Sequence, residues 1–186
     1  MNFVRAIVKF FYDFLEPIVL ILSVLMAIYL FVLQPFEVSG GSMIPNFHDG
    51  EYVLADKISY KFTTPKRGDV VIIVAPYNHD EDYIKRVVGL PGETVTVVEG
   101  KVYVNFEELK EDYTSAVTTI WDVEAVLQEA KDYTIPSGKY LVMGDNRPHS
   151  FDGRNFGAVP LDMIVGKAVF RIWPPRDFGI IPKITY

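Results

Sequence analysis

Ser42 has the clearest potential for chemistry in this sequence. It lies in residues 39–45, which read SGGSMIP, so the two glycines before it give its backbone unusual freedom. A serine hydroxyl is a weak nucleophile until a neighbouring group removes its proton. A nucleophilic role for Ser42 therefore requires a base that the fold brings close to it.

Lys85 is the strongest candidate for that base. Histidine is the usual partner of a serine, but lysine can serve when burial lowers its pKa from about 10.4 toward about 7–8. Lys85 lies in residues 83–93, YIKRVVGLPGE, where apolar neighbours on both sides predict a strand whose side chains enter a core. Simple strand alternation would instead point Lys85 to solvent, as for most strand lysines. His149 is an alternative base, although it sits in a polar loop and lacks an obvious acid to orient it.

A long apolar segment precedes Ser42. In residues 17–33 the only polar side-chain groups are the hydroxyls of Ser23 and Tyr29. This length is close to the ~17–25 residues that span a membrane, and no face of the stretch is polar. We therefore predict a transmembrane helix over residues 14–34. A cleaved signal sequence is the alternative, but its apolar run is usually shorter and its Ala-x-Ala site is only weakly imitated here, by residues 39–41.

The charges before this segment predict its orientation. Arg5 and Lys9 precede it, and positive flanking charges tend to stay in the cytoplasm. Residues 1–13 would then be cytoplasmic, and residues 35–186 would form an extracytoplasmic catalytic domain. The predicted location is the cell membrane, with a single pass.

The composition excludes several classes of protein. The 186 residues suit one domain plus an anchor. There are no cysteines, which excludes disulfides, thiolate catalysis and zinc–sulfur sites. The net charge is −6, and no basic cluster indicates a nucleic-acid surface. The three histidines form no metal-binding motif, so we predict neither a metal nor another cofactor.

The chain after the apolar segment has the pattern of a β domain. Residues 70–75 are a continuous apolar run, typical of a strand buried on both faces. Residues 94–98 and 101–104 flank Glu99-Gly100, which predicts a tight hairpin. Further strands are expected at residues 51–58, 139–143 and 164–173. We predict a mainly β fold, with an antiparallel β-sheet catalytic domain behind one N-terminal transmembrane helix.

Residues 106–132 form an acidic segment that differs from its surroundings. Asp122 is a plausible helix cap, and residues 122–131 carry helix-favouring side chains. We expect a partly helical insertion here, remote from the chemistry.

Four motifs together resemble those of the type I signal peptidases. The nucleophile motif of that family is matched by residues 39–45, and its lysine motif by residues 85–93. The short strand motif before the lysine is similar to residues 67–71, RGDVV. The C-terminal motif is similar to residues 144–154, which begin GDNR. Each motif alone is weak, but all four occur in the family's order behind an N-terminal anchor, which implies a β domain of signal-peptidase type.

The resemblance implies a role for each matching residue. Ser42 is the nucleophile and Lys85 the general base. Ser150 matches a serine that hydrogen-bonds the lysine and helps to orient its amine. The residues implied to support the site through polar contacts are Asp145, Asp152 and Arg154.

The chain departs from the family pattern close to the nucleophile. Many relatives have a serine two residues before it, which helps to stabilise the oxyanion, and this chain has Gly40. The backbone N–H of Ser42 would then carry most of that task, with a water or another donor. Asn46 also replaces a threonine that is common after the Met-x-Pro element. Contact with the substrate or with the membrane interface is expected from Phe36, Met43 and Pro45.

The function implied is that of a membrane-anchored serine endopeptidase that cleaves N-terminal signal peptides from exported preproteins through a Ser–Lys dyad. Its partners would be signal peptides with Ala-x-Ala-like sites and the lipid bilayer. Two alternatives remain. A catalytically idle relative that assists surface-protein assembly would have no need of Ser42 and Lys85. A self-cleaving Ser–Lys regulatory protease would need a DNA-binding head rather than a membrane span.

Overall fold

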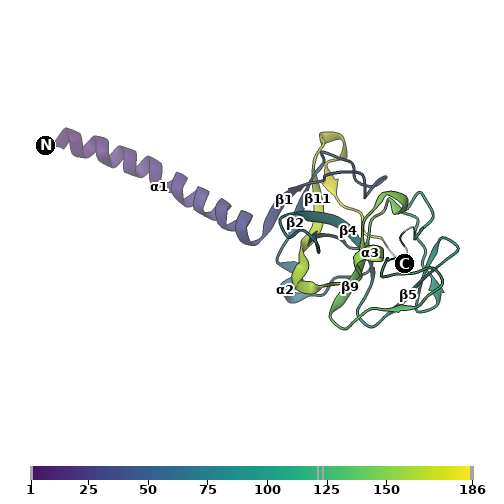
Figure 1. The fold of residues 1–186 in the computed structure, drawn as a ribbon. Helices are drawn as coiled ribbons and strands as arrows, with labels where there is room; N and C mark the ends of the chain where they lie inside the picture. The colour runs from purple at the N-terminus through teal and green to yellow at the C-terminus, as the bar shows by residue number, and fades with distance from the viewer. Residues whose placement is uncertain (1, 121, 123, 185–186) are drawn as a thin grey trace.

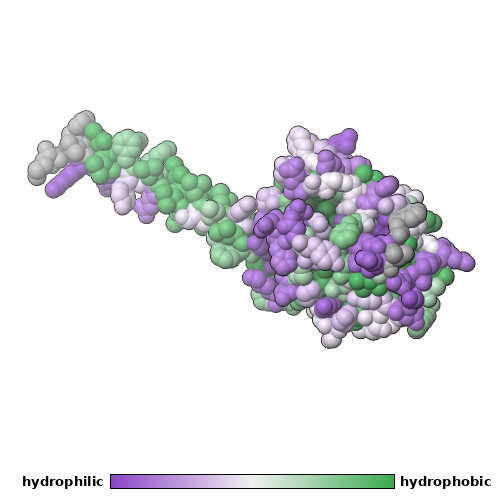
Figure 2. Space-filling model, in the orientation of Figure 1, coloured by the Kyte–Doolittle hydropathy of each residue, from purple (hydrophilic) through white to green (hydrophobic). Residues whose placement is uncertain are grey.

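A long helix extends from a folded β domain (Figure 1). The computed structural model describes residues 2–120, 122 and 124–184. The helix, α1 (Asn2–Phe31), contains a segment, Ile7–Phe31, that is long and apolar enough to cross a membrane. None of that segment is buried in the structure, and Figure 2 shows apolar side chains along it. Its 25 residues reach about 38 Å, more than the ~30 Å of a hydrocarbon core. A signal sequence would meet the same test of length and composition.

The helix ends earlier than the sequence predicted. The predicted span ran to residue 34, but residues 33 and 34 open β1 (Leu33–Glu37), which pairs antiparallel with β2 (Tyr52–Asp56). Pro35 favours this change, because the residue before a proline avoids the helical region. At its other end the helix includes residues 2–13, so no structural boundary separates the predicted cytoplasmic segment from the span.

The main sheet is antiparallel throughout. Its strands follow the order β1-β2-β11-β3-β4-β9-β10, and β12 pairs with β11. The remaining bounds are β3 (Val70–Val74), β4 (Asp82–Gly89), β9 (Lys139–Met143), β10 (Val159–Pro160), β11 (Ile164–Trp173) and β12 (Gly179–Ile180). The predicted mainly β, antiparallel fold is confirmed.

A smaller sheet follows the order β7-β6-β5-β8. Its strands are β5 (Thr94–Val98), β6 (Lys101–Val104), β7 (Glu107–Glu108) and β8 (Tyr133–Thr134). The predicted hairpin joins β5 to β6. Glu99 and Gly100 both have positive φ, at 49° and 80°, as the tight turns of twisted hairpins require.

The predicted helix in the acidic insertion is wrong. Among the described residues of 106–132 none is helical, and this holds for residues 122 and 124–131 in particular. The backbone there bonds to other parts of the domain instead. Leu127 donates to the carbonyl of Arg154 at 2.9 Å, and Ala130 donates to that of Val97 at 2.8 Å. These tertiary bonds outweigh a weak local helix preference.

Short helical turns lie elsewhere in the domain. They are α2 (Ser59–Phe62), α3 (Gly153–Phe156), η1 (Arg147–His149), η2 (Leu161–Met163) and η3 (Pro175–Asp177). Two of them, η1 and α3, follow β9 directly and carry the C-terminal motif. The positions of the motif residues are therefore set by the end of β9.

Candidate active site

The fold brings Ser42 and Lys85 into contact. Ser42 lies on the turn that follows β1, and Lys85 is the fourth residue of β4. The Nζ of Lys85 is 2.8 Å from the Oγ of Ser42, although 43 residues separate them in the chain. At this distance a neutral amine can accept the hydroxyl proton directly.

Lys85 is suited to be neutral near physiological pH. Its residue is only 3% exposed, and burial lowers the pKa of Lys85 to about 8. The Asp152 and Asp145 carboxylates oppose this shift by favouring the charged amine, while the charge of Arg154 adds to it. About a tenth of Lys85 is then neutral at pH 7, against less than ~0.1% of an ordinary lysine. Lys85 can therefore act as a base.

A buried ion pair fixes the strand next to the base. Arg86 donates through Nε and Nη2 to the two oxygens of Asp145, at 2.8 and 2.6 Å, and through Nη1 to the carbonyl of Gly68 at 2.9 Å. Its guanidinium also lies over the ring of Tyr113, 4.5 Å from the centroid. A bidentate pair has a fixed geometry, so it holds β4 and the segment that follows β9 in one arrangement.

A second buried ion pair acts on Lys85 through its charges. Arg154 donates through Nε and Nη2 to Asp152, at 2.9 and 2.8 Å, and the N–H of Gly144 donates to the same carboxylate at 2.9 Å. Burial alone would raise the pKa of Asp152, but the hydrogen bond and charge of Arg154, with the Gly144 N–H, hold it below the usual value. Asp152 is thus a stable negative charge that helps to solvate a protonated Lys85.

A small cavity opens beside Ser42 and Lys85. Its volume is about 50 Å³, and it is lined by apolar and aromatic side chains, among them Phe36, Ile72 and Tyr83, and by polar ones, among them Glu37 and Asp82. Residues 82–85 of β4 pair with β3 on one side, whereas the pairing of β4 with β9 begins at Arg86. β1 lies at the end of the sheet order, so two backbone edges are unpaired near the cavity. An extended peptide can add to such an edge.

Comparison with known proteins identifies the family of the chain. The family model for signal peptidase, peptidase S26, matches residues 11–173. The chain belongs to this family. It is 39% identical to signal peptidase IB of Staphylococcus aureus over 158 residues, and this match covers 80% of the chain and 82% of the relative. It is also 36% identical over 152 residues to thylakoidal processing peptidase 1, chloroplastic, of Arabidopsis thaliana, which covers 76% of the chain and 42% of that relative.

A solved structure is also similar. A signal peptidase I from Enterococcus faecalis is 32% identical, with a TM-score of 0.45, and the match covers 56% of the chain and 97% of that structure. The predicted class, a type I signal peptidase of the serine hydrolases, is confirmed by the family match and the relatives.

The residues expected to support a signal peptidase site mostly surround the pair. Asp145, Asp152 and Arg154 are buried and hydrogen-bonded there. Ser150 differs from its expected role. Its Oγ is buried beside Asp152 but has no hydrogen-bond partner of good geometry among the described residues, so the implied bond to Lys85 is not formed. Gly40 has φ +78°, a conformation that favours glycine, and its N–H donates to Asp49 at 2.6 Å.

One of the three expected contact residues is placed elsewhere. Met43 is 1% exposed and packs in a core cluster with Phe47 and Val53, so the expectation that it contacts substrate or membrane is wrong. Its burial anchors the turn that carries Ser42 instead. Pro45 is exposed, and Phe36 lines the small cavity. A contact of either with substrate or membrane remains a prediction.

The described residues contain no group of three or more His, Asp or Glu side chains that could hold a metal ion. His149, the alternative base, is exposed at the end of η1. It forms no hydrogen bond or ion pair with another described side chain, whereas Lys85 contacts Ser42. The geometry favours lysine as the base.

Sequence reasoning assigned no role to two asparagines that hold the turn of Ser42. Asn46 donates through Nδ2 to Asp145 at 2.8 Å and to the carbonyl of Tyr113 at 2.7 Å. Asn146 donates through Nδ2 to the carbonyl of Gly41 at 2.8 Å, and through its backbone N–H to that of Ser42 at 3.0 Å. Asn146 lies inside the C-terminal motif and Asn46 directly follows the nucleophile motif, but sequence spacing does not reveal such long-range amide bonds.

The acidic insertion was expected to be remote from the chemistry, but the structure places it against the C-terminal motif. Glu111 receives hydrogen bonds from both terminal nitrogens of Arg147, at 3.0 Å in one case, and Thr118 receives another from Arg147. Arg147 is 1% exposed and also donates to the carbonyl of Gly144 at 2.9 Å. The insertion thus packs against the back of the C-terminal motif, because the buried guanidinium of Arg147 needs a carboxylate partner.

Proposed function

We propose that this chain cleaves N-terminal signal peptides from exported preproteins as a membrane-anchored endopeptidase with Ser42 as nucleophile and Lys85 as base. The observation that carries the proposal is the 2.8 Å approach of a buried lysine amine to the Ser42 hydroxyl. The matched relatives that bear signal-peptidase names support the substrate class.

The reaction follows from this geometry. Ser42 Oγ attacks the scissile carbonyl while neutral Lys85 Nζ takes its proton. The resulting oxyanion is stabilised by the backbone N–H of Ser42. The Lys85 ammonium then protonates the amine of the departing mature chain, which leaves an acyl-enzyme. Lys85, neutral again, removes a proton from water, the water attacks the ester, and the proton returns to Ser42.

The cavity and the strand edges support recognition of small residues before the cleaved bond. A peptide that lies extended beside residues 82–85 directs alternate side chains toward the small cavity. A volume of about 50 Å³ suits the methyl group of alanine and excludes an aromatic ring. Ala-x-Ala-like sites are the substrates proposed on this basis.

A preprotein whose residue before the cleaved bond is changed from alanine to phenylalanine should be cleaved with kcat/KM lower by at least about 10²-fold, because the ring cannot enter the cavity. The measurement is cleavage by the full chain in detergent, followed by N-terminal sequencing of the product. As a control, the same change several residues into the mature part should leave the rate within about threefold. Equal cleavage of both preproteins would contradict the proposed recognition.

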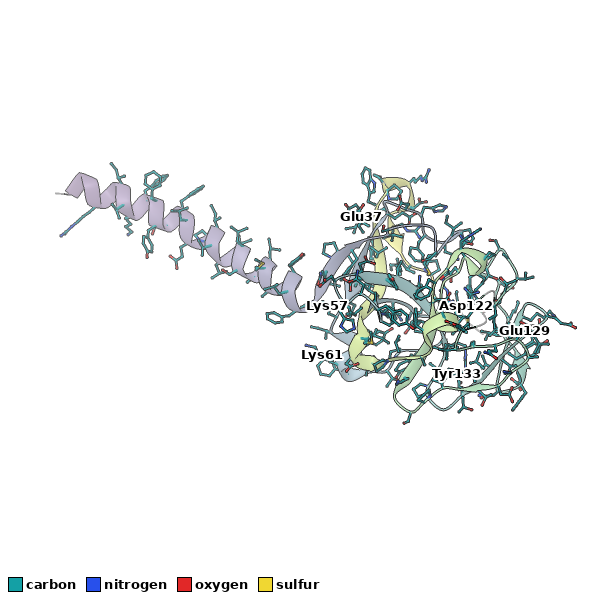
Figure 3. All side chains as sticks on the ribbon, viewed as in Figure 1. Glu37, Lys57, Lys61, Asp122, Glu129 and Tyr133 are labelled. Atoms are coloured by element: carbon teal, nitrogen blue, oxygen red, sulfur yellow. The ribbon has the colours of Figure 1, made fainter. Side chains whose placement is uncertain are left out.

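The anchor proposal rests on α1 and on its junction with the domain. Lys57 donates through Nζ to the carbonyl of Leu30 at 3.2 Å and to the side chain of Gln34 at 3.0 Å. Figure 3 shows Lys57 where α1 meets the β domain. A cation there satisfies a terminal carbonyl and favours the negative end of the helix dipole. With Arg5 and Lys9 at the other end, the proposed orientation leaves the β domain outside the cytoplasm.

Single cysteines test this orientation, since the chain has none of its own. In intact cells, a membrane-impermeant thiol reagent should label the Lys110→Cys variant and leave Lys9→Cys unlabelled. After lysis both should react, and the labelled Lys9→Cys protein should have full length. Labelling of Lys9→Cys in intact cells would refute the orientation, and its absence from the mature protein after lysis would indicate that the helix is removed.

A further inference from the structure

The peptide unit between Gly41 and Ser42 is held from its carbonyl side. The Nδ2 of Asn146 donates to the oxygen of Gly41 at 2.8 Å. That oxygen and the N–H of Ser42 belong to one planar trans peptide, so they point in opposite directions. A bond that fixes the carbonyl therefore also fixes the direction of the Ser42 N–H.

The next peptide unit is held by the same residue. The backbone N–H of Asn146 donates to the carbonyl of Ser42 at 3.0 Å. The two peptides that flank the Cα of the nucleophile are thus both bonded to Asn146. This leaves little freedom for the backbone of Ser42 to rotate.

Asn146 itself is held in place by hydrogen bonds in its own turn. Its carbonyl accepts from the N–H of His149 at 3.0 Å within the turn η1. The next residue, Arg147, is buried and is fixed by bonds to Gly144 and to Glu111. A rigid donor can impose an orientation on a glycine-rich turn that has few preferences of its own.

This orientation matters because Gly40 supplies no side-chain donor. The N–H of Ser42 is then the main protein group available to the oxyanion, and the value of such a donor depends on its being aimed in advance. A hydrogen bond to the carbonyl of a peptide also polarises that peptide, which makes its N–H a stronger donor.

We propose that Asn146 is the positioning residue of the oxyanion donor: its amide fixes the Gly41–Ser42 peptide so that the Ser42 N–H points at the position of the transition-state oxygen. This inference rests on the proposed function, with Ser42 as the nucleophile. Asn146 does not touch the substrate, and it acts only through the peptide that it holds.

The Asn146→Ala variant tests this assignment. It keeps the backbone bond to Ser42 and should remain folded, with kcat lower by about 10- to 100-fold and KM within about threefold, because an oxyanion contact is made only in the transition state. The pH dependence of its activity should match that of the wild type, since Asn146 does not contact Lys85. A peptide aldehyde, which forms a tetrahedral adduct with Ser42, should lose affinity by the same factor as kcat, while an uncleavable peptide should not.

Two further variants separate positioning from general support. Asn146→Asp keeps the volume but puts an acceptor against the Gly41 oxygen, so it should lose at least as much kcat as Asn146→Ala. Asn46→Ala removes two bonds from the same turn without touching the Gly41–Ser42 peptide. It should lower Tm by at least as much as Asn146→Ala, with a loss of kcat several-fold smaller.

The outcomes are distinguishable. Wild-type kcat in Asn146→Ala, a rise in KM at constant kcat, or equal losses of kcat in Asn46→Ala and Asn146→Ala would each overturn the inference. If Ser42→Ala is inactive while Asn146→Ala is fully active, only the inference fails. If Ser42→Ala cleaves normally, the proposed function fails with it.

Discussion

Replacement of Ser42 by alanine or of Lys85 by methionine is expected to lower preprotein cleavage by about 10⁴-fold or more, as removal of one member of a coupled catalytic unit does in other serine proteases. Ser42→Ala removes the attacking oxygen. Lys85→Met keeps an unbranched buried side chain, one heavy atom shorter, and removes the amine. The double variant should be no worse than either single one, because the two groups act in one step.

Both variants should fold normally. Lys85 is 3% exposed, so methionine fills the same space without the cost of burying a charge. Tm of Lys85→Met should therefore equal or exceed that of the wild type, which separates a catalytic loss from unfolding. Cleavage at a normal rate by either variant would refute the Ser–Lys mechanism.

The pH profile of the wild type provides a second test of the same pair. The base must be neutral, and burial lowers the pKa of Lys85 to about 8. The value of kcat/KM should therefore rise about tenfold per pH unit below pH ~7 and level off above pH ~9. A limb near pH ~6.5 that disappears in His149→Ala would instead indicate an imidazole base.

The elements that the sequence predicted well are those set by local chemistry. The continuous apolar run at 70–75 became the central strand β3, and Glu99-Gly100 became a tight turn because both residues adopt positive φ. The local signal failed at residues 122–131, where backbone bonds to Val97 and Arg154 replace a helix. The apolar pattern also predicted a helix end at residue 34, whereas α1 ends at Phe31 because strand pairing with β2 begins at Leu33.

Lys85 shows why the strand pattern of the sequence could not by itself identify the site residues. Its strand is buried on both faces from Ile84 onward, so alternation between core and solvent carries no information there. Its closeness to Ser42, 43 residues away, could be predicted only through the order of the family's motifs. The partners of Arg147 and of the two asparagines had no comparable signal, since they join segments that are distant in sequence through single side chains.

A substitution of Gly144 by alanine is expected to lower activity strongly, although Gly144 takes no part in the chemistry itself. A Cβ at this position would lie 2.5 Å from the backbone oxygen of Ser42 and closer still to the hydroxyl of Ser150. The neighbour on one side is backbone of the nucleophile turn, so the turn itself must move. Since misplacement by about 1 Å can cost about 10²-fold, kcat/KM should fall by about that factor.

The stability of Gly144→Ala should also fall, by about 1–3 kcal/mol for an overpacked site. Gly138→Ala is a matched control. Gly138 has φ +73° and open space around its Cα, so alanine there costs about 1–2 kcal/mol of backbone strain but touches nothing in the site. The two variants should lose Tm about equally, while only Gly144→Ala loses kcat/KM. That result would show that the close approach of Gly144 to Ser42 serves catalysis. A fully active Gly144→Ala enzyme would mean that the nucleophile turn tolerates displacement, and that its exact position is not required.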